Sequence, residues 1–489
     1  MQLIDISIFI VYMAGMLGVG FFFLRKNKGA DDYYVGGRNM GSAHIGLSVV
    51  ATDVGGGFSI GLGGLGFSMG LSGSWMLFTG LIGAWLAAVF LIPIIKGNKA
   101  FEKFLTFPQI FGYLYNGKVA FLAAVISAVG YLGFTSSQIL AGAKLANGTF
   151  KDLDLQTALI IMGTIAVVYT VMGGIKAVIY TDTIQWIILM GGLIFIGIPL
   201  SYNAIGGYSA IKNTVAPEML TFTNIDWQDF VNWGITIIPI WFVGMTLYQR
   251  IYACRDTKTA KRAWFLAGLF EWPIMAFMGV LLGLFARVAA DQGMFEYLGP
   301  ASIAAADNET GLPMLLRTVL PVGLMGLMMS AYFSAILSTA DSCLMASSGN
   351  VVSDLLEKGF KIKITEKNYL KFSQITTLMI GIVALLIASQ MESVLELMLY
   401  SYAFMVSGLF IPVIGGLYWR KSSSTGAFLA MLLGGTATVI LSLLLKFEVF
   451  DKLPLNLDAN IFGICISIVA LVSFSYLFPD KSVVKTETN

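Results

Sequence analysis

The chain has 489 residues, of which 57% are hydrophobic and only 12% are charged, and its formal net charge is +2. A mean hydropathy of +0.80 excludes a soluble globular domain of this length, and the near balance of charge excludes a typical nucleic-acid-binding protein. Three scattered cysteines and a single histidine, His44, argue against a metal centre and against histidine-based catalysis. We therefore expect a polytopic α-helical membrane protein that is not an enzyme.

Apolar segments long enough to cross a bilayer as helices recur along the whole chain. They lie near residues 5–24, 41–70, 73–95, 119–146, 157–174, 180–202, 231–249, 263–287, 312–348, 371–390, 394–418, 424–445 and 460–478. This pattern predicts about thirteen spans. No positive charge precedes the first segment, and Arg25, Lys26 and Lys28 follow it, so we expect a retained helix and not a cleaved signal peptide.

The distribution of basic residues supports this layout. With the N-terminus outside and thirteen spans, the cytoplasmic segments hold 23 of the 30 lysines and arginines. Cytoplasmic loops of membrane proteins carry such an excess. We expect an integral protein of the plasma membrane or bacterial inner membrane, with its N-terminus outside and its C-terminus in the cytoplasm.

Two of the predicted spans carry residues that interrupt a helix. The segment 41–70 contains Asp53–Gly57, and the segment 231–249 contains Pro239 and Gly244. Interrupted helices in matching positions indicate an inverted repeat with a binding site between its halves. We expect a single transport domain over residues 1–489, and its parts are an extra helix at 5–24, five-helix repeats at 41–202 and 231–418, and two C-terminal helices within 424–478.

The stretch VVATDVGGGFSIG, residues 49–61, places a carboxylate and three glycines inside an apolar segment. Glycine weakens a helix by about 1 kcal/mol relative to alanine, and unwound backbone within a membrane is tolerated where it lines a cavity. Its free carbonyl groups and Asp53 then form a polar pocket suited to a hard cation. The alternative is structural, with the glycines packing closely against another helix and Asp53 capping the second half-helix.

The stretch SAILSTADSCLMASS, residues 334–348, adds a second polar cluster in an apolar context. Ser338, Asp341 and Ser342 share one face of a helix, and Thr339 lies beside them. Hydroxyl, carboxylate and carbonyl oxygens together suit a hard cation, although serine and threonine also bond back to carbonyls of their own helix. Asp182 is a third polar candidate, or alternatively a loop acid or a helix cap.

Four stretches carry a family resemblance: ATDVGGG at 51–57, STADS at 338–342 with Ala335 before it, GGIKAVIYTDTIQ at 173–185 and YQR at 248–250. Together they resemble the sodium:solute symporter family over nearly the whole chain. The resemblance implies an all-α fold with a LeuT-type inverted repeat. It also implies that sodium drives the import of a small polar organic solute by alternating access. Asp53 resembles the sodium/proline branch, and the three glycines resemble the choline branch.

The resemblance also implies particular cation ligands. The main sodium site would consist of the carbonyls of Ala51, Val54 and Ala335 and the hydroxyls of Ser338 and Thr339. A second sodium site would consist of Asp182, Ser338, Asp341 and Ser342. Asp341 lies where a relative of that kind has serine, and the extra carboxylate could strengthen sodium binding or admit a proton.

The solute is expected beside the interrupted helices at the middle of the membrane. Candidate lining residues are Asp53, Gly56, Phe58, Tyr131, Ser137, Gln138, Trp241, Met245, Tyr248, Tyr400, Ser401 and Phe404. The aromatic members could instead be core residues. An ionised Asp53 favours an ammonium group, as in a proline-like amino acid or a choline-like amine, whereas an Asp53 neutralised by sodium leaves a sugar or carboxylate open.

Three other classes of protein were weighed against a symporter. A channel would need a selectivity ring, an intramembrane enzyme would need a nucleophile with a base, and a sensor would need an attached signalling module. The sequence favours a symporter whose partners are sodium, a small solute and the bilayer.

Overall fold

The computed structural model describes residues 3–26, 30–150, 153–298 and 308–480. Within these ranges some helical stretches are described without their side chains, among them 53–54, 57–59 and 172–174. Every regular element in the described ranges is helical. The principal helices are α1 (Leu3–Lys26), α3 (Ser42–Met69), α4 (Trp75–Leu86), α7 (Gly117–Thr149), α8 (Leu155–Gly192), α9 (Ile198–Ala204), α11 (Trp227–Val243), α12 (Met245–Ala253), α13 (Thr257–Leu269), α14 (Ala276–Asp291), α16 (Gly311–Val319), α17 (Leu324–Gly349), α18 (Glu366–Ala388), α19 (Val394–Tyr418), α20 (Ser424–Lys446) and α21 (Ala459–Leu477).

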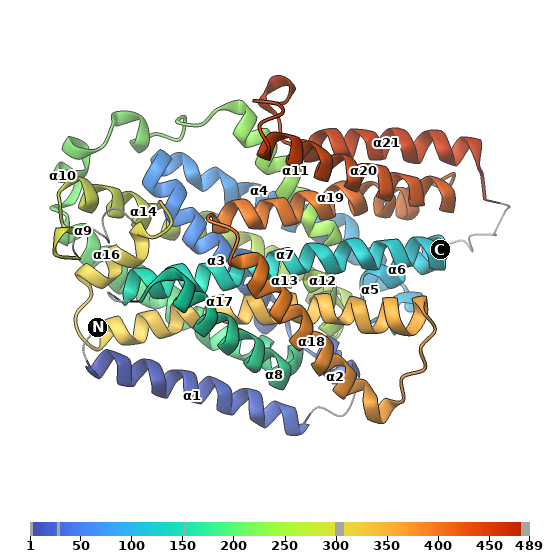
Figure 1. Ribbon diagram of the computed structural model, residues 1–489, viewed down its shortest axis with the longest axis horizontal. Helices are drawn as coiled ribbons and strands as arrows, with labels where there is room; N and C mark the ends of the chain where they lie inside the picture. Colours follow the sequence, from blue (N-terminus) through green and yellow to red (C-terminus); the bar gives the residue numbers. More distant parts are fainter. Residues whose placement is uncertain (1–2, 27–29, 151–152, 299–307, 481–489) are drawn as a thin grey trace.

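The helices form a bundle, and most of them run along the long axis of the molecule, with α20 and α21 on one side and α1 on the other (Figure 1). Nine helices in the described residues are long and apolar enough to cross a membrane, and the bent pair α11–α12 would make ten. Shorter apolar pieces are Leu3–Met16, Ser42–Thr52 and Leu155–Val171. The all-helical membrane fold is therefore confirmed, and the count of thirteen spans is not.

Helix α17 lies at the centre of the bundle. Every residue from Ala331 to Gly349 is buried, and α17 packs against α1, α3, α7, α8 and α18. A helix that is enclosed on all sides must satisfy its polar side chains within the protein. The polar cluster at 338–342 is therefore held between helices and faces neither water nor lipid.

Helix α3 is interrupted at Gly55, inside the predicted stretch Asp53–Gly57. Gly55 has φ 35° and ψ −166°, a conformation that glycine adopts far more readily than other residues. The neighbouring glycine brings α3 against α17, since a Cβ on Gly56 would lie 2.2 Å from Cγ1 of Ile336. The glycines therefore allow both the break and the close packing that we weighed as alternatives.

The second interruption lies at Gly244, between α11 and α12. The two helices differ in direction by 42°, and Gly244 is extended, with φ −67° and ψ 111°. Pro239 remains inside α11. Of the two residues that predicted an interruption here, Gly244 is the one at the bend.

Element α8 holds two of the predicted spans within one run of helical hydrogen bonding. Gly148, at the end of α7, packs against Pro313 of α16, and Gly197, just after α8, packs against Leu316 of the same short helix. A straight helix from residue 155 to residue 197 would extend over more than about 60 Å, so the chain reverses direction within α8. The helical assignment continues through residues 175–179, which separate the predicted spans 157–174 and 180–202.

Candidate cation and solute site

The hydroxyl of Thr339 joins the interrupted helix α3 to the central helix α17. Its Oγ1 lies 3.0 Å from the carbonyl oxygen of Ala51 and 3.3 Å from that of Ala335. Ser338 donates to the same Ala335 carbonyl at 3.0 Å. The structure thus brings together four of the five residues predicted for the main sodium site. The fifth, Val54, lies in the stretch of α3 whose side chains are not described, and the role of its carbonyl stays a prediction.

This cluster has the chemistry of a site for a hard cation. The two carbonyl oxygens and two hydroxyl oxygens are buried together at the break in α3. Thr339 has one hydroxyl proton for two carbonyl acceptors, so the cluster has lone pairs to spare. Oxygen ligands of this kind are those that hard, weakly polarisable cations prefer. The side chain of Thr339 reaches this position because Gly55 has no Cβ, which would stand 2.6 Å from Oγ1.

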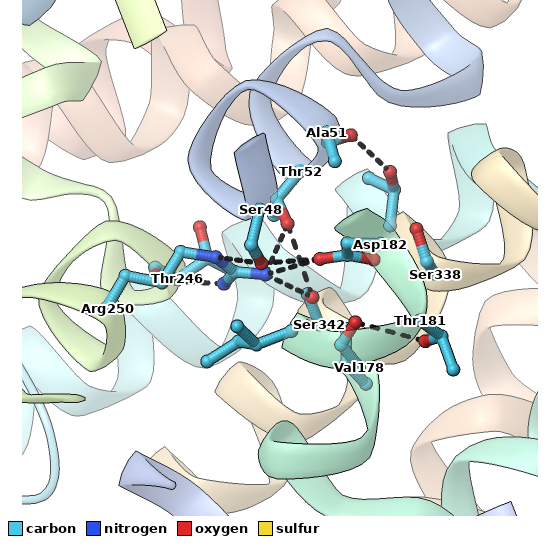
Figure 2. A network of polar contacts seen from close by, with 12 residues as sticks. Ser48, Ala51, Thr52, Val178, Thr181, Asp182, Thr246, Arg250, Ser338 and Ser342 are labelled. Carbon is cyan, nitrogen blue, oxygen red and sulfur yellow. Dashed lines mark hydrogen bonds and ion pairs between the residues drawn. The ribbon is translucent and has the colours of Figure 1, made fainter. Parts of the chain in front are cut away.

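A buried arginine lies next to this cluster, and Figure 2 shows polar side chains from three helices gathered around it. Arg250 of α12 has no exposed surface. Its Nε donates to Ser48 at 3.0 Å, its Nη2 donates to Thr52 at 2.5 Å and to Ser342 at 3.0 Å, and its Nη1 donates to the Thr246 carbonyl at 3.1 Å. The guanidinium group therefore ties α12 to both α3 and α17.

Asp182 of α8 is the counter-charge of this arginine. Its Oδ2 lies 3.5 Å from Nη2 of Arg250 and accepts a hydrogen bond of 2.5 Å from Ser48. Ser48 consequently accepts from the cation and donates to the anion. Oδ1 of Asp182 has no hydrogen-bond partner among the residues that the structure describes. A buried charge needs a partner, and here Arg250 and Asp182 supply each other.

Asp341 faces α8 at a different point. Its Oδ1 contacts the hydroxyl of Thr170, which also lies 2.8 Å from the Ala166 carbonyl. Its Oδ2 has no partner in the described part of the chain. Of the residues predicted for a second sodium site, Asp182 and Ser342 contact Arg250 and Asp341 contacts Thr170. A shared cation site of these residues with Ser338 stays a prediction.

Helix α7 contacts both interruptions through residues predicted to line the solute pocket. Oε1 of Gln138 accepts the backbone N–H of Gly56 at 3.0 Å. The hydroxyl of Tyr131 lies 3.0 Å from Oγ1 of Thr246 and accepts the Thr246 N–H at 3.2 Å. Residues seven apart share a helix face, so one face of α7 presents polar groups to α3 and α12 together.

The three candidates from the second interrupted segment are packed in the bundle. Trp241 packs edge-on against Trp264 with ring centroids 6.4 Å apart. Tyr248 lies 4.5 Å from the ring of Phe107, and the Met245 sulfur accepts the Phe107 N–H at 3.1 Å. All three side chains are fully buried. Their contacts are those of core residues, and a core position was the alternative to a solute-binding role for the aromatic candidates.

The candidates on α19 are not brought to the site. Tyr400 is 42% exposed and its hydroxyl donates to Glu396 at 2.6 Å, while Phe404 packs against Gly435 of α20. Residues four apart lie on neighbouring parts of one helix face, and a role of Tyr400 and Phe404 in lining the solute pocket stays a prediction. Ser401 lies on another face, where its hydroxyl packs against Gly133 of α7. The side chains of Asp53 and Phe58 lie outside the described residues.

A sequence profile of the sodium:solute symporter family matches residues 33–434 of this chain. The chain belongs to the sodium:solute symporter family. This membership confirms the resemblance drawn from the motifs, and with it the prediction of an integral membrane protein that performs sodium-coupled solute symport.

Characterised members of the family align over most of the chain. The chain is 28% identical to the high-affinity proline transporter PutP of Bacillus subtilis, with 87% of this chain and 89% of that protein covered. It is 25% identical to the sodium/proline symporter of Salmonella typhimurium, with 91% and 89% covered. It is also 27% identical to the sodium/glucose cotransporter of Vibrio parahaemolyticus, with 91% and 86% covered.

Solved structures show the same fold. The substrate-bound outward-open state of a Na+-coupled sialic acid symporter has a TM-score of 0.78 at 23% identity, with 98% of this chain and 99% of that one covered. Mhp1, a nucleobase-cation-symport-1 family transporter, has a TM-score of 0.55 at 16% identity, with 92% and 96% covered. The LeuT-like architecture expected for this symporter is thereby confirmed.

Sequence reasoning missed three residues of the site in this symporter. Ser48, Thr52 and Arg250 were not candidates, and Arg250 follows directly after the predicted span 231–249, among the residues assigned to the cytoplasm. It lies instead inside α12, with every nitrogen of its guanidinium group bonded. The available signal was an ionisable residue directly after an interrupted apolar segment, since an intramembrane charge indicates function by default.

Proposed function

We propose that this symporter imports a proline-like amino acid together with sodium, and that the sodium ion binds where Ala51, Ala335, Ser338 and Thr339 meet. The observation that carries the proposal is the position of the Thr339 hydroxyl, within 3.3 Å of backbone carbonyls on two different helices. The carbonyl of Val54 would complete the ligand set. A cation in this position would connect α3 to α17 by direct ligation.

Such a connection accounts for coupling in physical terms. A ligand shifts a conformational equilibrium only by its difference in affinity for the two states. An ion held jointly by α3 and α17 favours the state in which these helices are together, which is the state that would bind solute at the break. Inward movement of each positive charge also gains about 2.3 kcal/mol per 100 mV of membrane potential.

The proposal for the solute rests on the named relatives and on the polar groups at the break. Proteins named as proline transporters or sodium/proline symporters align with 87–94% of this chain. Beside the interruption, the Gly56 N–H donates to Oε1 of Gln138, and the two groups form a polar pair at the break. We propose that they face the zwitterionic part of the solute, with Asp53 as partner of its ammonium group.

We propose that Asp182, Ser338, Asp341 and Ser342 form a second cation site that Arg250 occupies in part. The guanidinium group already supplies one positive charge to Asp182 and a donor to Ser342. A second sodium ion at these oxygens would require Arg250 to withdraw. One sodium ion per solute is accordingly the proposed stoichiometry while Arg250 remains in place.

We further propose that residues 1–489 form one transport domain with five-helix repeats at 41–202 and 231–418. The extra helix at 5–24 precedes them and the helices within 424–478 follow them. The N-terminus lies outside and the C-terminus in the cytoplasm, in a plasma membrane or bacterial inner membrane. The excess of lysine and arginine in the segments assigned to the cytoplasm supports this orientation.

The test is uptake into proteoliposomes of labelled proline, choline, glucose and a monocarboxylate, each with and without an inward sodium gradient. Thr339→Ala is expected to reduce sodium-dependent proline uptake at least about tenfold, the effect of about 1.4 kcal/mol of lost ligation. Thr339→Ser, which keeps the hydroxyl, is expected to retain most of it.

The control is Thr377→Ala in α18, because within the described residues the buried Thr377 hydroxyl donates to the Ser373 carbonyl of its own helix, at 2.8 Å. That variant is expected to transport normally. Uptake of proline without sodium dependence, or full activity of Thr339→Ala, would refute the sodium assignment. Sodium-driven uptake of glucose, choline or the monocarboxylate in place of proline would refute the solute assignment alone.

A further inference from the structure

A buried ion pair outside the cation site connects three parts of the molecule. Nζ of Lys144, on α7, lies 2.8 Å from Oε2 of Glu309, which comes just before α16. The side chains are 4% and 9% exposed. No feature of the proposed sodium or solute site uses this pair, and burying two charges requires that each be well compensated.

Glu309 also caps the first turn of α19. Its Oε2 accepts the Val394 N–H at 3.0 Å, and its Oε1 accepts the Leu395 N–H at 3.0 Å and the Ser393 hydroxyl at 3.3 Å. The first N–H groups of a helix have no partner within the helix and carry partial positive charge. A single carboxylate therefore holds the end of α19 and the ammonium group of α7 together.

The outer half of α3 packs directly onto this carboxylate. Gly64 lies against Cγ of Glu309, and a Cβ on Gly64 would be 3.3 Å from it. A Cβ on Gly61 would be 3.0 Å from Leu395, and one on Gly63 would be 3.0 Å from Leu312. The glycines therefore allow α3 to pack closely against the start of α19 and the start of α16.

The position of the pair along the helices places it between the break and one end of the bundle. Lys144 is six residues beyond Gln138, which contacts the break, and this corresponds to about 9 Å along α7. Gly64 is eight residues beyond Gly56, or about 12 Å along α3. In the orientation proposed above, this end faces outside, so a solute arriving from outside must pass the level of Glu309.

We propose that Glu309 is an outer latch of the transport cycle, a positioning residue that holds α19 and α7 together over the solute site and must release them for loading. The inference rests on the proposed function, because the proposed orientation in the membrane assigns Glu309 to the outer side. The ion pair suits this role, because the Coulomb energy of a buried pair is largely cancelled by its desolvation. Opening to water returns the hydration of both groups and so offsets much of the Coulomb energy that is lost. The latch therefore favours the closed state by a modest free energy and can be broken repeatedly.

The test measures access to cysteine reporters on the two halves of α3. Ile60→Cys reports on the outer half and Val49→Cys on the inner half, since both native side chains are fully buried. Each is placed in a Cys465→Ser background, which removes the exposed native cysteine. A membrane-impermeant maleimide is added from the outer side for Ile60→Cys and from the inner side for Val49→Cys.

Glu309→Gln is expected to accelerate outer labelling of Ile60→Cys at least about tenfold, as a shift of the population toward the outward-open state requires. The rate of inner labelling of Val49→Cys is expected to equal the rate in the protein that keeps Glu309, or to be lower. Lys144→Met should also accelerate outer labelling of Ile60→Cys, whereas Lys144→Arg should leave the labelling rate near that of the native latch. The matched control is Asp291→Asn, which removes the 2.8 Å pair of Arg287 with Asp291, a partly exposed pair on α14.

Unchanged labelling of Ile60→Cys in both Glu309→Gln and Lys144→Met would overturn the proposal. Acceleration of both reporters together would also overturn it, because general loosening of the fold has no preferred side. Labelling requires neither proline nor sodium. Failure of the solute or sodium assignment would therefore appear in the uptake experiment and leave this measurement interpretable.

Discussion

Single side chains decide how this apolar bundle tolerates charge near its centre. Arg250 donates to oxygens of α3 and α17 and to a carbonyl of its own helix, and Asp182 supplies its counter-charge. Thr339 joins helices without carrying a charge, because its hydroxyl contacts a carbonyl of α3 and a carbonyl of α17. The polar residues of the site therefore serve two purposes, because they satisfy one another and join helices α3, α8, α12 and α17.

Removal of one member of the buried pair should be costly. Asp182→Asn leaves the Arg250 guanidinium without a counter-charge, and the loss expected for such a change is about 3–5 kcal/mol of stability. Thermal unfolding of the purified protein in detergent, followed by tryptophan fluorescence, should show a clear fall in the midpoint. The double variant Asp182→Leu with Arg250→Met should lie closer to the native midpoint than either single variant.

The matched control for this prediction is an exposed pair. Arg255 and Asp256 are 3.4 Å apart with side chains 64% and 53% exposed, and a surface pair contributes about 0–1 kcal/mol. Asp256→Ala would also remove the cap on Thr259, so Arg255→Gln is the cleaner control. Equal effects of Arg255→Gln and Asp182→Asn would contradict the assignment of Arg250 and Asp182 as a mutually required pair.

The meeting of Thr339 with Ala51 and Ala335 was predictable from the sequence, and the polar contacts around it were only partly so. Thr339 and Ala51 follow from local motifs, because a break in a helix and a hydroxyl on a neighbouring helix can be read from short stretches. Arg250 was missed because the sequence does not show that α12 returns into the bundle after Gly244. The directions in which Tyr400 and Phe404 point could not be predicted, because the rotation of α19 about its axis depends on packing with α20, which no local pattern encodes.

At the scale of elements, glycines determine where helices break and where they meet. Gly55 supplies the left-handed conformation at the break in α3, and Gly56 permits contact with Ile336 of α17. The two interrupted segments could be predicted from the positions of glycine and proline. The change of direction inside α8 could be predicted, because hydropathy separates the spans 157–174 and 180–202. The helical hydrogen bonding between these spans could not be predicted from hydropathy alone.

Gly56→Ala should separate these two helices. The added Cβ would stand 2.2 Å from Cγ1 of Ile336, and overpacking of this kind typically costs about 1–3 kcal/mol. Because Ile336 lies between Ala335 and the Ser338–Thr339 cluster, we expect weaker sodium binding as well as a lower unfolding midpoint. Sodium titration of the unfolding midpoint measures both effects at once.

The control for that change is Gly191→Ala on α8, where a Cβ meets nothing within 4 Å. Replacement of glycine by alanine inside a helix is then expected to be neutral or stabilising, by up to about 1 kcal/mol. The prediction would be contradicted if Gly56→Ala had the same unfolding midpoint and the same response to sodium as Gly191→Ala. The close approach of α3 and α17 would then not be needed.

At the scale of the whole molecule, the contacts fall at three levels along the bundle. Arg250 and Asp182 join α12, α3 and α8 at one level, the Thr339 cluster lies at the break, and Glu309 joins α7 and α19 about 9–12 Å further along. Alternating access requires that contacts on the two sides of a central site open in turn. The buried polar contacts in this symporter are arranged in this way, with the Thr339 cluster between two sets of ionic contacts.

The most direct test of the central claim is binding of labelled proline to the purified symporter at graded sodium concentrations, with ²²Na⁺ binding measured at graded proline. Our account predicts that sodium raises proline affinity and that proline raises sodium affinity by the same factor, since linkage between two binding sites is reciprocal. It predicts that Thr339→Ala abolishes this factor in both directions. Proline binding that is independent of sodium, or a coupling factor that persists in Thr339→Ala, would contradict a sodium site at the junction of α3 and α17.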